Sequence, residues 1–192
     1  MLSRHEARTL SLLYMNRNQE HVMERRIEMI GLQKYRHVLS MLLLCASPGT
    51  WANMGDSELI AAAGNGNVSR VKTLLATKAN VNAKADNGVT ALIAASQNGY
   101  EEVVQVLIEA KADINAKTSN GTTALMQASQ KGHGEVVREL LAAKADVNAR
   151  RGDSVTVLMQ ASQEGHRQIV QMLLTAGADV NARLGNGATA LM

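Results

Sequence analysis

The feature that most constrains this chain is a repeat with a period of 33 residues, which begins near Ala52. Three consecutive copies, at residues 85–117, 118–150 and 151–183, keep the same register without an insertion or a deletion. A divergent copy at 52–84 precedes them, and a partial copy at 184–192 follows. A fixed period of this length predicts a solenoid, in which each copy buries its apolar surface against its neighbours.

Each copy predicts a turn followed by two short helices and a loop. The pairs Asn87-Gly88, Asn120-Gly121 and Asn186-Gly187 indicate tight turns, because Gly accepts a positive φ without steric cost and Asn tolerates it. A first helix follows, and its inward residues are mostly small. These inward residues include Leu125, Ala128 and Ser129. Gly99, Gly132 and Gly165 are placed to end that helix.

The second helix of each copy is marked by an apolar stripe. In the third copy the stripe consists of Val136, Val137, Leu140 and Leu141, at the spacing of one helical face. The two helices of one copy cannot bury all of their apolar surface against each other, so neighbouring copies must stack on them.

The motifs inside the copies give the repeat a family resemblance. The three full copies contain T-x-L-x-x-A, two of them contain G-H, and the last contains G-A-D-V-N-A near its end. With the 33-residue period, these motifs resemble the ankyrin repeat over residues 53–192. The matching residues are Thr90, Leu92 and Ala95; Thr123, Leu125 and Ala128; Thr156, Leu158 and Ala161; Thr189 and Leu191; Gly132-His133, Gly165-His166 and Gly177 to Ala182. The resemblance implies an all-α solenoid of stacked helix-turn-helix units joined by β-turn loops.

Three lysines depart from the family pattern. Lys78, Lys111 and Lys144 stand where the family has the Gly that precedes A-D. If the backbone keeps a positive φ there, each lysine costs about 1 kcal/mol.

Charge and aromatic content argue against a nucleic-acid partner. The formal charge of +3 lies entirely in residues 1–52, because residues 53–192 hold 13 basic and 13 acidic side chains. Phosphate binding needs a concentrated basic field. Beyond Trp51 the only aromatic residue is Tyr100, which leaves little for base stacking.

Residues 29–52 have the parts of a secretory signal peptide. Lys34 and Arg36 precede an apolar run at 38–46, which is too short to span a membrane, and the segment ends Thr50-Trp51-Ala52. We expect cleavage between Ala52 and Asn53. The mature chain then has no Cys, which suits an oxidising compartment. The predicted location is the periplasm or the medium of a bacterial cell, with the cytoplasm as the alternative.

A signal peptide should stand at the start of a chain, but 28 residues precede this segment, which raises the question of where translation starts. We expect residues 1–28 to be an upstream extension, with translation starting at Met29 or Met23. Three alternatives stay open. The segment could be an amphipathic helix that covers the first repeat, a lipoprotein signal at Cys45, or a twin-arginine signal at Arg25-Arg26.

No catalytic, cofactor or metal site is expected from the motifs. Equivalent positions of different copies hold His133 and His166, so we interpret both as caps of a second helix. Gly64-Asn65-Gly66 lacks the Lys-Ser/Thr of a phosphate loop and reads as a turn. No Ser, Thr or Cys has a base and an orienting acid nearby.

The resemblance implies a protein partner, of unknown identity. The open ends of the stack allow weak end-to-end self-association as an alternative to a monomer. The resemblance places the contacts at the turn tips and on the outward side of the first helix. These residues are Asp86, Asn87, Val89, Gln97 and Asn98; Ser119, Asn120, Thr122, Gln130 and Lys131; Gly152, Asp153, Val155, Gln163 and Glu164. One column of equivalent positions is basic and is either a solvated row or a surface that binds an acidic partner. Its members are Lys84, Lys117, Arg150 and Arg183. Because residues 184–192 stop early in a copy, we also expect a longer array.

Overall fold

The structure is a computed structural model that describes residues 48–185 and 187–190. The chain divides into two units, Met1–Gly49 and Thr50–Met192, and the description below concerns the second. The predicted upstream extension at 1–28 lies outside the described residues, as does the predicted signal peptide up to residue 47.

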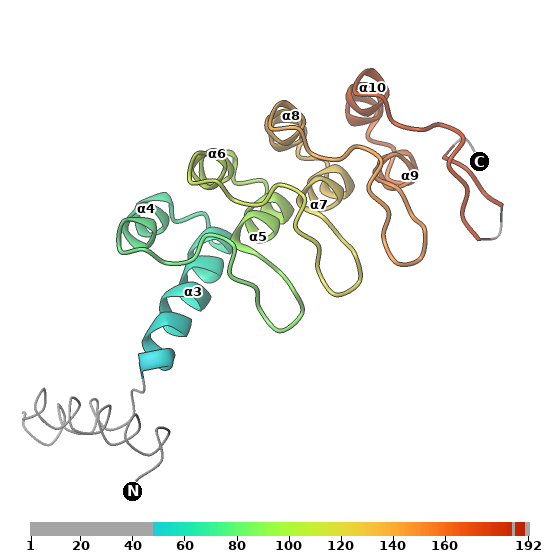
Figure 1. The fold of residues 1–192 in the computed structure, drawn as a ribbon. Helices are drawn as coiled ribbons and strands as arrows, with labels where there is room; N and C mark the ends of the chain where they lie inside the picture. Colours follow the sequence, from blue (N-terminus) through green and yellow to red (C-terminus); the bar gives the residue numbers. More distant parts are fainter. Residues whose placement is uncertain (1–47, 186, 191–192) are drawn as a thin grey trace, which may run out of the picture. The chain divides into compact units, whose positions relative to one another are not determined.

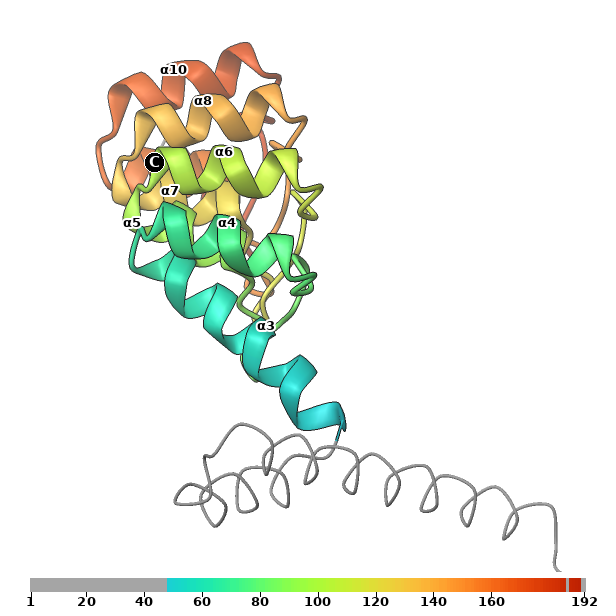
Figure 2. The ribbon, with the colours of Figure 1, turned by 90° about the vertical axis from the view of Figure 1, so that its left-hand side faces the viewer.

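The described residues form paired helices joined by loops, in the order that the repeat predicts. The helices are α3 (Pro48–Gly64), α4 (Val68–Ala76), α5 (Ala91–Asn98), α6 (Glu101–Glu109), α7 (Ala124–Lys131), α8 (Gly134–Ala142), α9 (Val157–Gln163) and α10 (Arg167–Thr175). Figure 1 shows the first helices α5, α7 and α9 in one row and the second helices α4, α6, α8 and α10 in another. Seen from the side, the second helices lie one above the next (Figure 2). The described part is thus an all-α stack of helix-turn-helix units, as expected.

Each regular first helix starts at a threonine cap. The side chain of Thr123 accepts a hydrogen bond from the backbone N–H of Met126 at 3.3 Å, and Thr90 and Thr156 do the same in their copies. Because an N-cap oxygen satisfies a backbone donor that the helix leaves unpaired, it fixes where the helix begins. Gly99 and Gly132, with left-handed backbones, end α5 and α7 as predicted. Helix α9 ends one residue earlier, with Glu164 as its cap.

The predicted apolar stripe of the second helix is confirmed. Val136, Val137 and Leu140 of α8 are buried, whereas Leu141 is half-buried. Small residues line the contact between first helices, since Ala95, Ala128 and Ala161 are fully buried. A side chain of that size allows neighbouring helices to approach closely, so the core runs continuously from copy to copy.

The second helices end with a strained residue, as the three lysines predicted. Lys144 has φ 65°. Its N–H bonds to the Leu141 carbonyl at 3.0 Å, and the next N–H, of Ala145, bonds to Leu140 at 2.9 Å. These two bonds form a Schellman motif, which needs a left-handed residue at this point. Lys78 and Lys111 have the same geometry, with φ 66° and 67°.

The first copy differs from the expected pattern at its start. Helix α3 begins at Pro48 and runs for 17 residues, whereas the first helices of the later copies have seven or eight. Pro at the first helical position is well tolerated, because its missing N–H would have no partner there. The predicted cleavage point between Ala52 and Asn53 therefore falls inside α3.

Candidate binding surface

Hydrogen bonds between hairpin tips align the successive copies. The copies from residue 85 onward begin with a small hairpin, and the N–H of Ser119 bonds to the Asn87 carbonyl of the preceding tip at 2.9 Å. Gly152 donates to Asn120 in the same way, also at 2.9 Å. The tips of copies 85–117, 118–150 and 151–183 are therefore held in register.

A ladder of asparagines adds a second link between copies. Asn82, Asn115 and Asn148 occupy the same position in three copies. Each side-chain oxygen accepts the backbone N–H of an Asp 31 residues further on, at 2.7 to 2.8 Å. The asparagine of the A-D-V-N-A motif thus binds its neighbour, a role that the sequence of a single copy does not reveal.

The histidines form a third link, and here the prediction was wrong. His133 and His166 stand at the N-cap positions of α8 and α10, but neither side chain caps its helix. Instead, the Nε2 atoms lie 3.0 Å from the backbone carbonyl oxygens of Gln97 and Gln130 in the preceding copy. Each ring therefore fixes the backbone of the copy before it.

The same rings cover the glycines that separate the two helices. A Cβ atom added to Gly99 would come 2.5 Å from the His133 ring, and one added to Gly66 would come 2.7 Å from Tyr100. Tyr100 thus occupies in the first junction the place that histidine takes in the later ones. These contacts require glycine at the junction for reasons of space as well as of φ.

The structure places most of the predicted contact residues on the surface, with one exception. Thr122 is only 5% exposed, and its hydroxyl lies 2.7 Å from the side-chain oxygen of Asn120. It belongs to the turn and is not available to a partner. The half-buried residues are Val89, Gln130 and Val155. The exposed residues are Asp86, Asn87, Gln97, Asn98, Ser119, Asn120, Lys131, Gly152, Asp153, Gln163 and Glu164.

Several exposed polar groups are already used within the stack. The side-chain oxygen of Asn87 accepts the N–H of Val89 at 3.1 Å, and Asn120 does the same for its own turn. The amide of Asn98 donates to the carbonyl of Gly64 at 2.9 Å. The side chains of the turn tips therefore hold the hairpins, and the outward side of the first helices keeps the uncommitted polar groups.

One hairpin tip carries an ion pair in place of Asn-Gly. The guanidinium of Arg151 donates from Nε to both carboxylate oxygens of Asp153, at 2.9 and 3.1 Å, and also from its terminal nitrogen. This hydrogen bonding lowers the pKa of Asp153 to about 2. The following Ser154, which replaces the glycine, has φ 67°.

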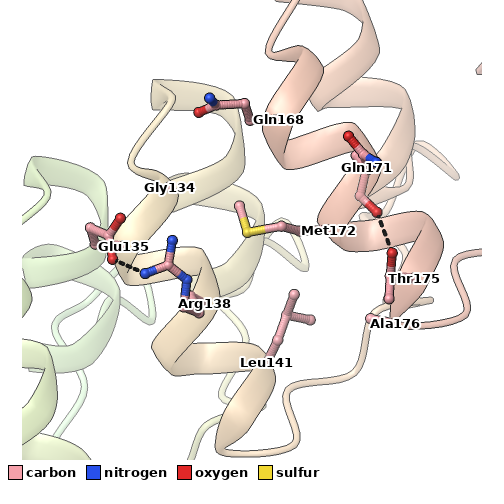
Figure 3. A pocket seen from close by; sticks show the side chains of 9 residues that line it. All are labelled: Gly134, Glu135, Arg138, Leu141, Gln168, Gln171, Met172, Thr175 and Ala176. Carbon is pink, nitrogen blue, oxygen red and sulfur yellow. Dashed lines mark hydrogen bonds and ion pairs between the residues drawn. The ribbon is translucent and has the colours of Figure 1, made fainter.

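A hollow of about 570 Å³ lies on the opposite side of the stack, between α8 and α10. Figure 3 shows Met172 of α10 and Leu141 of α8 at its centre, with Glu135 paired to Arg138 at its rim. Gly134, whose counterpart is Glu101 in the preceding copy, lines the same hollow.

Among residues 48–185 and 187–190, no cluster of three His, Cys, Asp or Glu side chains could hold a metal ion. In that part of the chain no helix combines the length and the apolar character needed to cross a bilayer.

Comparison with known families agrees with the motifs. A family model described as ankyrin repeats, in three copies, matches residues 32–118 and 112–184, which together cover most of the chain. A search of the curated proteins found no match.

Proposed function

This chain belongs to the ankyrin repeat family, whose repeats indicate a protein-protein interaction module, and from that premise we propose an exported, non-catalytic module that binds a protein on its first-helix side. The binding surface comprises the outward residues of α5, α7 and α9 with the adjoining hairpin tips.

The binding proposal rests on polar side chains that have no hydrogen-bond partner and lie on helices held in place by links between the copies. Gln97, Gln130, Lys131 and Gln163 make no side-chain hydrogen bond or ion pair within the part of the chain that the structure describes. Their helices are held by the hairpin, asparagine and histidine links. A surface that is ordered before binding loses little entropy on binding, which favours affinity.

Export is supported by the sequence pattern of residues 29–52 and by the position of the core. The first described buried residues of α3 are Leu59, Ala62 and Ala63. Cleavage between Ala52 and Asn53 would leave all three in the mature chain. The mature protein would then have no Cys, so no disulfide could form or mispair in an oxidising compartment.

Fractionation with terminal sequencing tests the export proposal. A chain expressed from Met29 in a Gram-negative host should reach the periplasm or the medium and begin at Asn53. A cytoplasmic product that still begins at Met29 would refute export and favour an adaptor whose N-terminal helix stays on the stack.

Affinity capture tests the binding proposal. The tagged chain is used to capture a partner from the exported fraction, and the captured protein is then purified. Its affinity is compared for the wild type and for the variant Gln130→Glu, Lys131→Glu, Gln163→Glu. We expect weaker binding with nearly unchanged stability, because Lys131 and Gln163 are exposed, Gln130 is half-buried, and surface substitutions outside caps and core usually shift stability by less than about 0.5 kcal/mol. Unchanged affinity would place the contact on another face.

A second candidate role is structural self-association. It is favoured by exposed apolar side chains on the last complete copy, where Leu174 is 44% exposed and Val180 is 37% exposed. Light scattering across a range of protein concentrations distinguishes this role. A size that grows with concentration would support it, whereas a constant monomer would support the binding module alone.

A further inference from the structure

Three glutamines form a row along the candidate binding surface. Gln97, Gln130 and Gln163 occupy the same position at the ends of the neighbouring helices α5, α7 and α9. Their side-chain amides have no hydrogen-bond partner within residues 48–185 and 187–190. We call these residues the glutamine row. A primary amide both donates and accepts hydrogen bonds, as a peptide group does.

A second pair of glutamines extends the row along the helices. Gln127 and Gln160 precede Gln130 and Gln163 by three residues, so each pair shares one helix face. Gln160 is only 5% exposed, and its Oε1 atom has no partner within the described residues. A buried acceptor without a partner is unfavourable, and the backbone N–H of a non-proline residue in a bound segment would satisfy it.

Ring side chains border the row. The Nε2 atoms of His133 and His166 lie 3.0 Å from the backbone oxygens of Gln97 and Gln130, so each ring meets the backbone of a row residue. Tyr100 holds the equivalent place one copy earlier and is 38% exposed. Each copy of the stack therefore contributes one glutamine of the row and one neighbouring ring.

That period selects the conformation of a bound chain. Packed helices are about 8–10 Å apart, so neighbouring members of the row have this spacing. A polyproline II helix rises about 3.1 Å per residue and presents the same face every third residue, about 9.3 Å apart. A β-strand also covers about 10 Å in three residues, but its alternating faces turn every third residue away.

We propose that the glutamine row binds an extended segment of a partner protein in the polyproline II conformation. The glutamine amides donate to the segment's backbone carbonyls at every third residue, and the rings of Tyr100, His133 and His166 contact its side chains. A polyproline II chain has no internal hydrogen bonds, so its carbonyls are free to accept. The inference rests on the proposed function, and it defines the kind of partner.

The test measures binding of a labelled peptide of twelve prolines to the full chain by fluorescence anisotropy. Polyproline has no backbone N–H, so its hydrogen bonds with the row must come from the glutamine amides. The row variant is Gln97→Glu, Gln130→Glu, Gln163→Glu, which keeps the shape but removes the donors. We expect it to bind about tenfold more weakly or worse, because each lost hydrogen bond accounts for about a fivefold change.

The matched control places the same three charge changes on exposed glutamines of the second helices: Gln105→Glu, Gln168→Glu, Gln171→Glu. The control should bind polyproline as the wild type does, and a flexible Gly-Ser peptide of equal length should bind less tightly to all three proteins. Circular dichroism checks that each variant is folded. If the triple row variant is not folded, Gln130→Glu alone is compared with Gln105→Glu alone.

Two outcomes overturn the inference. One is the absence of polyproline binding by the wild type at millimolar peptide, and the other is equal weakening by the row variant and the control. If the captured partner still loses affinity for the row variant while polyproline does not bind, the partner is a folded surface. The binding module then stands without the extended segment. If the captured partner ignores the row variant as well, the proposed surface is wrong too.

Discussion

At the scale of single residues, three lysines hold a backbone conformation that suits glycine. Lys78, Lys111 and Lys144 have φ near +66°, and Gly177 fills the same position in the last copy. The left-handed conformation is unfavourable for any residue with a Cβ. The exposed side chains of these lysines make no ion pair within the described residues that would offset this cost.

Replacing each lysine with glycine should therefore stabilise the stack. We expect Lys111→Gly and Lys144→Gly each to raise the free energy of unfolding by up to about 1 kcal/mol. Urea unfolding followed by circular dichroism measures the change. Lys117→Gly is the control, since Lys117 is exposed without a positive φ, and it should not stabilise. Equal effects at Lys117 and Lys111 would contradict this account of strain.

The Arg151–Asp153 pair gives a prediction about pH. The hydrogen bond from Arg151 lowers the pKa of Asp153 to about 2, below its ordinary value near 3.8. A lowered pKa means that the pair stabilises the folded state above the ordinary value and stops doing so as the pH falls toward 2. An NMR titration of the Asp153 carboxyl should show its pKa rising toward the ordinary range in Arg151→Ala. An unchanged pKa in that variant would show that the guanidinium is not the cause.

At the scale of elements, the junction between the two helices of a copy depends on the next copy. Gly99 and Gly165 both have a positive φ, but His133 covers Gly99, and an added Cβ at Gly165 would meet nothing within 4 Å. Gly165→Ala should cost about 1 kcal/mol for the backbone alone. Gly99→Ala should cost about 1 kcal/mol more, because the displaced ring loses its hydrogen bond to Gln97. Thermal unfolding of both variants measures the difference, and equal losses would show that the ring does not hold the junction.

Local patterns predicted the elements well and the links between copies poorly. Helix ends such as Thr123 and Gly132 could be predicted because capping acts within a few residues. The partner of Asn115 lies 31 residues away and that of His133 lies 36 residues away, and the sequence of one copy contains no sign of either.

At the scale of the whole stack, stability should decline toward the last complete copy. Repeat stacks are stabilised by contacts between neighbours. Helix α8 packs against both α6 and α10, whereas no described helix follows α10, and Leu174 is largely exposed there. Hydrogen exchange should therefore be slower in α7 and α8 than in α9 and α10. Equal protection in the two copies would mean that the last copy is stabilised in some other way.

The claim that a protein binds on the first-helix side is tested most directly by the glutamine side chains themselves. The full chain, labelled with ¹⁵N, is titrated with the captured partner while the side-chain amide signals are recorded by NMR. The signals of Gln97, Gln130 and Gln163 should shift or broaden, and those of Gln105, Gln168 and Gln171 on the second helices should stay in place. Shifts confined to Gln105, Gln168 and Gln171 would contradict the proposed surface.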